Sequence, residues 1–346
     1  DTVTWADLDT APADGAGLRF ALTDRPTQQR RTTATLDLTT TSNILIVGSR
    51  GSGRTTALRT LTAAAHTAGL DTVNIPSDTE GAWDTVHTLV DDMRSPNLTP
   101  RLCLLDDLDL VLSRTPDEHR DTLSRTLASL LAEGPARGTH TALSLTRISA
   151  ATSSLCSHCD ARIVLRTVDR HDHQAAGAEP HQHDPSLPPG RGWYRGDLIH
   201  IVTTDTSRPA AAPKPTPELP HNTGLIVSTR PAELANRLSD TWGSERIRLL
   251  TPSALAGSDT SAFATSAGEH HRVLIADPDS WLARHALFTE LGRRHPTAYH
   301  ACTTAQYRQL SGDRTLPPPL ATPHDTVWLT HPTASVCRAA LPASQP

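Results

Sequence analysis

The sequence predicts an α/β fold, with a core built on a mostly parallel sheet and followed by a smaller α/β domain. A β-branched strand at 44–47 runs directly into a glycine-rich loop, and a helical pattern starts at residue 55. The run 102–105 is apolar throughout, as parallel strands are when helices cover both faces of their sheet. A proline-rich segment at 209–220 separates this region from a second group of short strands and helices.

The elements of the first region follow in the order strand, helix, helix, strand, helix, strand, strand. The first helix repeats apolar residues on one face until Gly69 supplies a C-cap, and the apolar spacing over 83–93 predicts a second helix. Thr115 and Pro116 predict the start of a third, with Thr115 as N-cap and Pro116 at the first helical position. The last two strands of this region are predicted at 140–146 and 161–165.

Beyond the proline-rich segment, short strands alternate with helical patterns. Strands are predicted at 225–228, 247–250, 273–276 and 327–329, and helices at 231–242, 279–291 and 303–310. This region has no glycine-rich loop between a strand and a helix. We therefore expect a core domain over residues 1–208, a linker over 209–220 and a small α/β domain over 221–346.

Composition limits both the core and the kinds of partner. A chain of 346 residues suggests about two domains, and an aromatic content of 3% leaves burial mainly to Leu, Val, Ile and Ala. A net charge of -5 with one lysine, Lys214, argues against binding a polyanion over the whole surface. No apolar run approaches the roughly 20 residues that span a bilayer, so we expect no direct membrane insertion by this chain. The chain starts at Asp1 and is expected to be part of a longer protein, and its five scattered cysteines favour a reducing compartment.

Residues 48–55 match the phosphate-binding loop pattern G-x-x-x-x-G-K-[ST] at every defined position except one. Successive backbone N–H groups of such a loop, together with a helix N-terminus, bind phosphate. An ordinary glycine turn is the alternative, which the flanking strand and helix disfavour. We predict that nucleotide is bound by Gly48, Ser49, Arg50, Gly51, Ser52, Gly53, Arg54, Thr55 and Thr56, with the Thr55 hydroxyl on Mg²⁺.

The exception is Arg54, which stands where the pattern has lysine. Lysine places a compact charge between the β- and γ-phosphates, whereas arginine is longer and planar. We expect binding to survive and hydrolysis to slow, by about a hundredfold or on the order of 3 kcal/mol if arginine does not substitute.

The run 102–107 has the form of a Walker B strand ending in two carboxylates. Asp106 is predicted to hold Mg²⁺, and Asp107 to polarise the attacking water as a catalytic residue together with Arg54. Asp107 is one methylene shorter than the glutamate that ATPases of this kind generally use. The alternative for both acids is a solvated loop start or a helix cap.

Two further patterns stay open. Thr146 and Arg147 close the next strand, either as a sensor of the γ-phosphate or as an ordinary polar strand end. Cys156 and Cys159 supply half a zinc site, with candidate partners at His171, His173, His181 and His183. Surface histidines and buried thiols are favoured over a metal there.

Together these residues resemble the FtsK/SpoIIIE ATPases, and in particular the degenerate downstream ATPase modules of EccC-type proteins of type VII secretion. Residues 21–31 are similar to the family's lead-in, 188–192 to its closing hairpin, and 161–166 with Asp169 and Asp172 to the strand and turn before that hairpin. The resemblance covers roughly residues 15 to 205.

The resemblance implies a RecA-like P-loop NTPase core, ATP as ligand, and membrane anchoring through regions outside this chain, on the cytoplasmic side. It also implies assembly with other ATPase modules of the full-length protein into a homo-hexamer that moves DNA or a secreted protein. Only 51 positions separate Thr55 from Asp106, which leaves little room for the insertions of full motor modules and favours a regulatory module.

Three functions follow from these observations. The first is an ATP-binding module with weak or absent hydrolysis that regulates or stabilises a translocation machine. The second is an active DNA-translocating ATPase, in which Arg54 works in place of lysine and an arginine such as Arg137 comes from a neighbouring subunit. The third is a nucleotide-free protein-interaction domain, with Trp5, Trp193 or Trp281 marking pockets for secreted segments.

Overall fold

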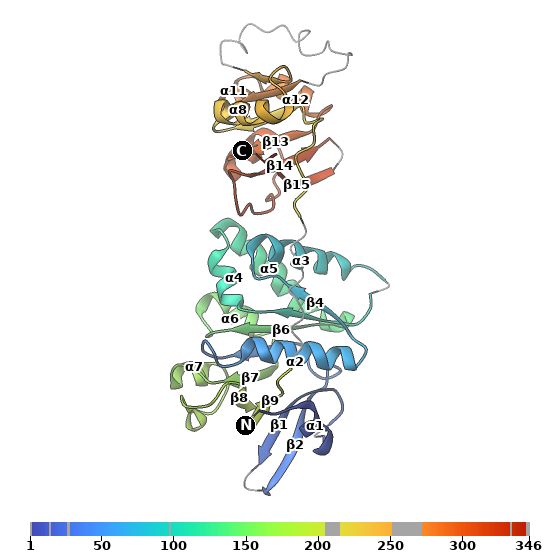
Figure 1. Cartoon of the computed structure of the whole chain (residues 1–346), viewed down its shortest axis with the longest axis vertical. Coiled ribbons are helices and arrows are strands. Elements are labelled where there is room, and N and C mark those ends of the chain that lie inside the picture. Colours follow the sequence, from blue (N-terminus) through green and yellow to red (C-terminus); the bar gives the residue numbers. More distant parts are fainter. Residues whose placement is uncertain are drawn as a thin grey trace. The chain divides into compact units, whose positions relative to one another are not determined.

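The structure is a computed structural model that describes residues 2–13, 15–25, 28–96, 98–204, 215–250, 272–332 and 334–343. The chain divides into two compact units, Asp1–Pro213 and Lys214–Pro346, each with its own sheet (Figure 1). Residues 209–214 of the predicted linker, and with them Lys214, lie outside the described residues.

Five parallel strands form the centre of the first sheet, in the order β7-β3-β6-β5-β4. They are β3 (Ile44–Val47), β4 (Asp71–Ile75), β5 (Arg101–Leu105), β6 (Thr139–Leu145) and β7 (Ala161–Leu165). Every residue of β3, β5 and β6 is buried, as expected for strands with helices on both faces. The predicted parallel α/β core is confirmed.

The predicted element order omitted β4, which lies between the first two helices. This strand is at the edge of the sheet, and Ile75 is its only buried residue. The two helices on either side of it are α2 (Arg54–Thr67) and α3 (Thr79–Asp92). A crossover between parallel strands therefore replaces the predicted helix–helix succession.

Four antiparallel strands extend this sheet beyond β7, in the order β8, β9, β1, β2. They are β1 (Leu18–Arg25), β2 (Arg30–Leu36), β8 (Arg191–Tyr194) and β9 (Asp197–Ile201). Ala21 pairs with Ile201, and the Arg25 guanidinium lies 2.7 Å from the Asp197 carboxylate. The lead-in and the closing hairpin, far apart in sequence, therefore belong to one continuous sheet.

The remaining helices of the first unit are α1 (Trp5–Thr10), α4 (Leu108–Arg114), α5 (Asp117–Glu133), α6 (Ala150–Cys156) and α7 (Arg170–Ala175), with 3₁₀ turns at Pro135–Arg137 and Pro180–Gln182. The predicted start of α5 is wrong by one residue. Pro116 is its N-cap, and the Thr115 hydroxyl instead donates to the Val111 carbonyl at the end of α4. Since only two residues separate α4 from α5, Thr115 serves the helix that ends there.

The second unit contains a six-stranded sheet of order β11-β12-β10-β13-β14-β15. The strands are β10 (Leu225–Ser228), β11 (Ile247–Leu249), β12 (Val273–Ala276), β13 (Thr297–His300), β14 (Thr326–His331) and β15 (Ala334–Ala340). In the described part of this unit the helices are α8 (Pro231–Trp242), α11 (Pro278–Ala283), α12 (His285–Gly292) and α13 (Thr304–Ser311). The helix predicted over 279–291 is thus two helices separated at Arg284, and neither β13 nor β15 was predicted.

The second sheet repeats the order of the first with one central strand fewer. The first runs β4-β5-β6-β3-β7-β8-β9, and in both sheets parallel strands end in an antiparallel pair. A counterpart of β6 would follow β12, but residues 277–296 form α11 and α12 there without a strand. The second unit is therefore a shortened version of the same α/β plan.

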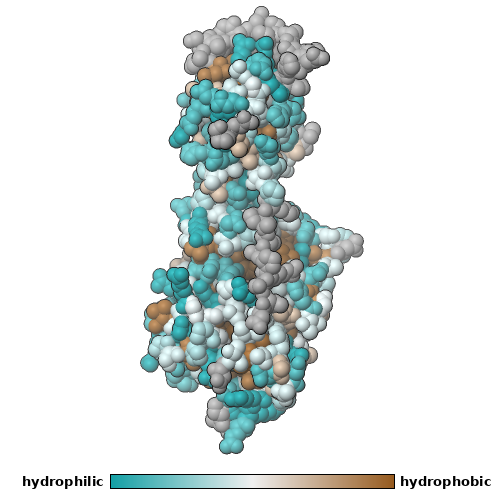
Figure 2. Space-filling view, viewed as in Figure 1, coloured by the Kyte–Doolittle hydropathy of each residue, from teal (hydrophilic) through white to brown (hydrophobic). Residues whose placement is uncertain are grey.

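Figure 2 shows that hydrophilic and intermediate residues dominate the visible face, with hydrophobic residues in small separate groups. In the described part of the chain, the large hydrophobic residues that are exposed are Leu110, Val168 and Leu249. None of the helices in the described ranges is both long enough and apolar enough to cross a bilayer.

Candidate functional site

The loop 48–53 joins the end of buried β3 to the start of α2, at the carboxyl edge of the parallel strands. Two backbone N–H groups anchor it to the strands on either side of β3. Gly48 donates to the Leu145 carbonyl at 3.2 Å, and Ser49 donates to the Arg166 carbonyl at 2.8 Å. The Ser52 N–H then donates back to Ser49 at 3.1 Å, so the loop is curled and not extended.

Glycine is required at Gly53 for two physical reasons. Its φ of +105° lies in the left-handed region, and a Cβ there would come within 2.8 Å of the Gly190 nitrogen. The Gly190 N–H also donates to the Ser52 carbonyl at 2.8 Å. The hairpin that resembles the family's closing element therefore lies directly against the loop.

The mouth of the loop has room for an anion. Arg50, Gly51 and Thr55 are exposed, and a Cβ on Gly51 would meet only the Arg166 guanidinium, 3.9 Å away. The first N–H groups of a helix have no intrahelical partner, so those at the start of α2, Thr56 included, are available to a phosphate. The loop, the helix start and a neighbouring cation together fit a phosphate group.

The Thr55 hydroxyl and the Asp106 carboxylate, the two side chains predicted to hold Mg²⁺, lie together. The hydroxyl donates to Asp106 Oδ2 at 2.6 Å, which leaves hydroxyl lone pairs for a cation. The Ser144 hydroxyl on β6 donates to Asp106 Oδ1, and the Asp107 N–H donates to the same oxygen at 3.1 Å. Hydroxyl and carboxylate oxygens are the ligands that Mg²⁺ prefers, so the donor set fits this ion.

The two predicted catalytic side chains, Arg54 and Asp107, bind each other. Arg54 Nη2 lies 2.6 Å from Asp107 Oδ1, and Nη1 donates to the Thr146 hydroxyl at 2.9 Å. The Arg54 side chain is only 11% exposed, against 36% for Asp107. Asp107 adopts the left-handed conformation, with φ of +53°, as N-cap of α4. Arg54 therefore points along the carboxyl edge of the sheet to the end of β6.

The carboxylates at this edge affect one another electrostatically. Loss of hydration raises the pKa of Asp107, the Arg54 guanidinium opposes that rise, and the nearby charges of Asp106 and Asp109 add to it. Asp109 accepts the Thr146 N–H at 3.1 Å through Oδ2, while its buried Oδ1 has no hydrogen bond. Acidic groups are thus concentrated beside a single deeply placed guanidinium.

Ser144, Arg166 and Asp109 were not predicted as site residues. Ser144 lies in β6 and Arg166 directly follows β7, the two strands beside β3, so the strand order brings both residues to the loop. Asp109 follows the two predicted acids by two positions, so the acidic run D-D-L-D was the signal for it.

The other candidates lie elsewhere. Arg147 is exposed, and exposed Arg137 lies before β6 at the amino edge of the sheet, so it faces away from the loop of its own chain. Trp281 does not mark a surface pocket, because it is fully buried and its indole N–H donates to the Ile226 carbonyl. Trp5 and Trp193 are partly buried.

No three His, Cys, Asp or Glu side chains within the described ranges are arranged to hold a metal ion. Cys156 and Cys159 are buried, and burial raises the pKa of their thiols to about 11 and about 12.

The strand order and the curled glycine loop at the carboxyl edge, beside the Thr55–Asp106 pair, define a RecA-like α/β core with a loop of the phosphate-binding form. The sequence matches no protein-family model and no curated protein. Among solved structures, the chain is similar to the cytoplasmic domain of the type VII secretion ATPase EccC of Thermomonospora curvata, with a TM-score of 0.55 and 14% identity over 97% of this chain. The chain spans 61% of the length of that structure.

The chain is also similar to a structure of ATPases 2 and 3 of the same EccC in complex with a signal sequence peptide. The TM-score is 0.51 and the identity 13%, over 95% of this chain and 94% of that one. The predicted resemblance to EccC-type ATPase modules is therefore confirmed as a likeness of fold.

Proposed function

We propose that this chain is an ATP-binding module of a type VII secretion ATPase, with weak or absent hydrolysis. The observation that carries the proposal is the Thr55–Asp106 hydrogen bond of 2.6 Å beside a curled loop at a helix N-terminus. The N–H groups of the loop and of the first turn of α2 bind the phosphates. Thr55 and Asp106 hold Mg²⁺, which neutralises phosphate charge when it is bound.

Weak hydrolysis is supported by the state of Asp107. Asp107 Oδ1 is occupied by the Arg54 guanidinium at 2.6 Å, so this oxygen is not open to an attacking water in this arrangement. The same contact keeps Arg54 from acting on a γ-phosphate. Hydrolysis therefore requires both side chains to leave their present partners.

The full-length context belongs to the same proposal. We infer that the chain works with other ATPase modules, in a hexamer anchored on the cytoplasmic side of a membrane by regions outside this chain. Support comes from the fold likeness to EccC, whose cytoplasmic domain extends beyond the length covered here. The exposed Arg137, at the opposite edge from the loop, reaches a nucleotide only from a neighbouring subunit.

The test is ATP affinity of the whole chain, measured by calorimetry with and without Mg²⁺. We expect Thr55→Ala to weaken binding about tenfold with Mg²⁺ and much less without it, because the hydroxyl acts through the ion. Thr62→Ala, on the same helix with its hydroxyl bonded to the Leu58 carbonyl, is the matched control. Absence of ATP binding by the unaltered chain would refute the proposal.

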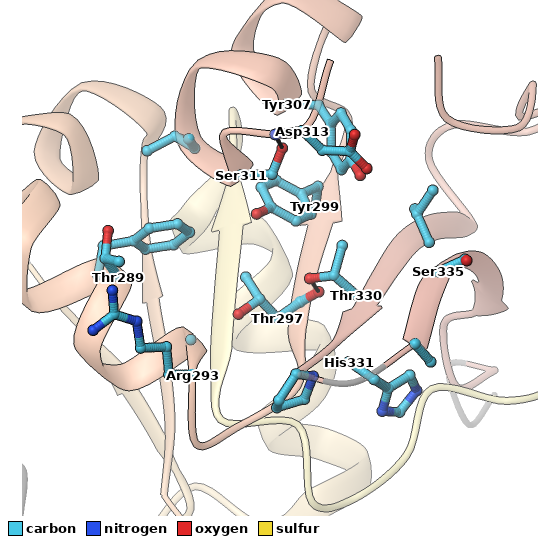
Figure 3. Close-up of a pocket in the computed structure, with 16 residues that line it drawn as sticks. Thr289, Arg293, Thr297, Tyr299, Tyr307, Ser311, Asp313, Thr330, His331 and Ser335 are labelled. Carbon is cyan, nitrogen blue, oxygen red and sulfur yellow. Dashed lines mark hydrogen bonds between the residues drawn. The ribbon is translucent and has the colours of Figure 1, made fainter. Parts of the chain in front are cut away.

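The second unit supports a second function, binding of a secreted protein segment. It contains a pocket of about 380 Å³ lined by α12, β13, α13, β14 and β15 (Figure 3). Tyr299 and Tyr307 lie there with ring centroids 4.9 Å apart, and Arg293 and Asp313 add opposite charges to its lining. An aromatic side chain of an extended segment fits such a pocket. The similar EccC structure was solved with a signal sequence peptide.

This second function is tested with a peptide from a type VII secretion substrate. Thr289→Trp, which places an indole in the pocket lining, is expected to weaken peptide binding at least tenfold. Glu290→Trp, at the neighbouring exposed position outside the lining, is the control. Equal affinity in both variants would contradict this use of the pocket.

A further inference from the structure

The polar groups nearest to the expected γ-phosphate position are already bound to one another. Arg54 contacts the Asp107 carboxylate at 2.6 Å and the Thr146 hydroxyl at 2.9 Å. Thr146 in turn donates its N–H to Asp109 at 3.1 Å. These side chains therefore bind one another in one internal network and are not open to a ligand. The network consists of Arg54, Asp107, Thr146 and Asp109.

The groups that bind the inner phosphates are outside this network. The loop is held by its neighbouring strands and by Gly190, and Gly51 has open space with the Arg166 guanidinium nearby. The Arg166 guanidinium is held by the Leu187 carbonyl at 3.2 Å. A diphosphate can therefore bind to the loop and helix start while the Arg54–Asp107 pair stays intact.

A third phosphate meets a different environment. Beyond the loop lie the carboxylates of Asp106, Asp107 and Asp109, and Arg54 is the cation paired among them. Mg²⁺ at Asp106 would compensate one carboxylate. The γ-phosphate would still lie near the Asp107 carboxylate, and it gains the Arg54 cation only if Arg54 turns away from Asp107. Turning Arg54 away leaves Asp107 without its ion-pair partner, which is costly for a partly buried acid.

We propose that the Arg54–Asp107 pair sets the ligand preference of the phosphate loop, so that a nucleoside diphosphate binds at least as tightly as the triphosphate. The inference rests on the proposed nucleotide-binding function and names the phosphate chain length that the site prefers. Asp107 is then a specificity-determining residue, because it holds the one side chain that a lysine-type contact to the γ-phosphate requires.

The experiment compares ADP and ATP affinities of the whole chain with Mg²⁺, by calorimetry. The unaltered chain is expected to bind ADP as tightly as ATP or more tightly. Asp107→Asn keeps the shape of the side chain and removes its charge, and asparagine tolerates the left-handed conformation at this position. We expect ATP affinity to rise about tenfold in this variant, with ADP affinity changing less than about threefold.

Two further variants make the result decisive. Arg54→Lys supplies a shorter, compact charge and is expected to raise ATP affinity selectively as well, which covers the case of an unfolded Asp107→Asn. Asp117→Asn removes an acid that is 90% exposed, on α5, and controls for net charge. It is expected to leave both affinities unchanged.

The possible outcomes distinguish failure of the diphosphate preference from failure of nucleotide binding. If the unaltered chain binds ATP more tightly than ADP, or if Asp107→Asn changes both affinities equally, the diphosphate preference is overturned and nucleotide binding stands. If neither nucleotide binds, the proposed function itself fails and the preference fails with it.

Discussion

Gly53 meets two demands that no other residue meets together, a left-handed φ and the close approach of the Gly190 backbone. We predict that Gly53→Ala lowers the free energy of unfolding by about 3 kcal/mol, from backbone strain and from overpacking against a backbone that cannot move aside. Nucleotide affinity is expected to fall as well, because the methyl group displaces either the hairpin or the loop. Urea unfolding and ATP titration measure the two effects.

Gly69 provides the matched control for this prediction. Its φ is +74° and a Cβ there meets nothing within 4 Å, so Gly69→Ala isolates the conformational cost, about 1 kcal/mol. Equal destabilisation by the two substitutions would show that contact with Gly190 contributes nothing.

Asn43, just before β3, is fully buried and satisfies three backbone groups. Its Nδ2 donates to the carbonyls of Leu131 and His158 at 2.8 and 3.0 Å, and its Oδ1 accepts the Thr141 N–H at 3.0 Å. Asn43→Ala leaves these groups buried without partners, and we predict a loss of about 3 kcal/mol in unfolding free energy. Ser42→Ala, at the adjacent exposed position, should change it by less than about 0.5 kcal/mol. A loss in Asn43→Ala as small as the control's would contradict the prediction.

Short sequence motifs were sufficient to predict the loop and its candidate Mg²⁺ ligands, but they did not predict where the Arg54 side chain points. The loop, Thr55 and Asp106 lie in short contiguous motifs whose spacing reflects the chemistry of phosphate and Mg²⁺. The direction of Arg54 follows instead from the end of β6 and the backbone of Asp107, which are remote in sequence. Sequence spacing predicts which residues reach the carboxyl edge, but it does not predict which of them pair there.

The strands that sequence reasoning missed share a physical cause. Edge strand β4 buries little, and β1 and β2 carry arginine and threonine in an antiparallel extension. Polar residues are mixed with apolar ones along all three strands, so no continuous apolar run marks them. The central strand β3 and residues 102–105 of β5 were predicted correctly because burial on both faces leaves a run of apolar residues there.

The ends of β10 and β13 are joined by a buried hydrogen bond that responds to pH. His300 Nδ1 lies 2.8 Å from the Ser228 hydroxyl, and Nε2 lies 3.3 Å from the His324 carbonyl. Loss of hydration, the largest cause, lowers the pKa of His300 below its usual 6.5. The unfolded chain then binds a proton that the folded chain resists, so stability falls as pH drops below about 6.5.

We therefore predict that His300→Gln reduces the pH dependence of unfolding. Urea unfolding of the chain from pH 7.5 to pH 5 should show a smaller loss of stability in the variant. His173 and His200 in the first unit also have pKa values lowered by burial, so some dependence remains. An identical pH slope in the variant and in the unaltered chain would contradict the role of His300.

The two sheets share one plan, yet among the residues that the structure describes only the first has the elements of a phosphate site. Two residues, Thr229 and Arg230, separate β10 from α8, against six between β3 and α2. A two-residue connection cannot curl into a nest of N–H groups. At the end of β12, Asp277 uses its carboxylate to cap α11, accepting from the Ser280 N–H at 2.9 Å and from its hydroxyl at 2.6 Å.

These differences predict one nucleotide per chain. In the second unit the strand-end hydroxyl of Ser228 is bonded to His300, and the acid in the position of Asp106 is bonded to its own helix. Calorimetric titration should therefore give a stoichiometry near one, and Thr55→Ala should weaken the whole of the Mg²⁺-dependent signal. Asp277→Asn, the corresponding change in the second unit, should leave the affinity unaltered. Two equivalent sites would mean that the shortened sheet binds nucleotide through groups other than those of a phosphate loop.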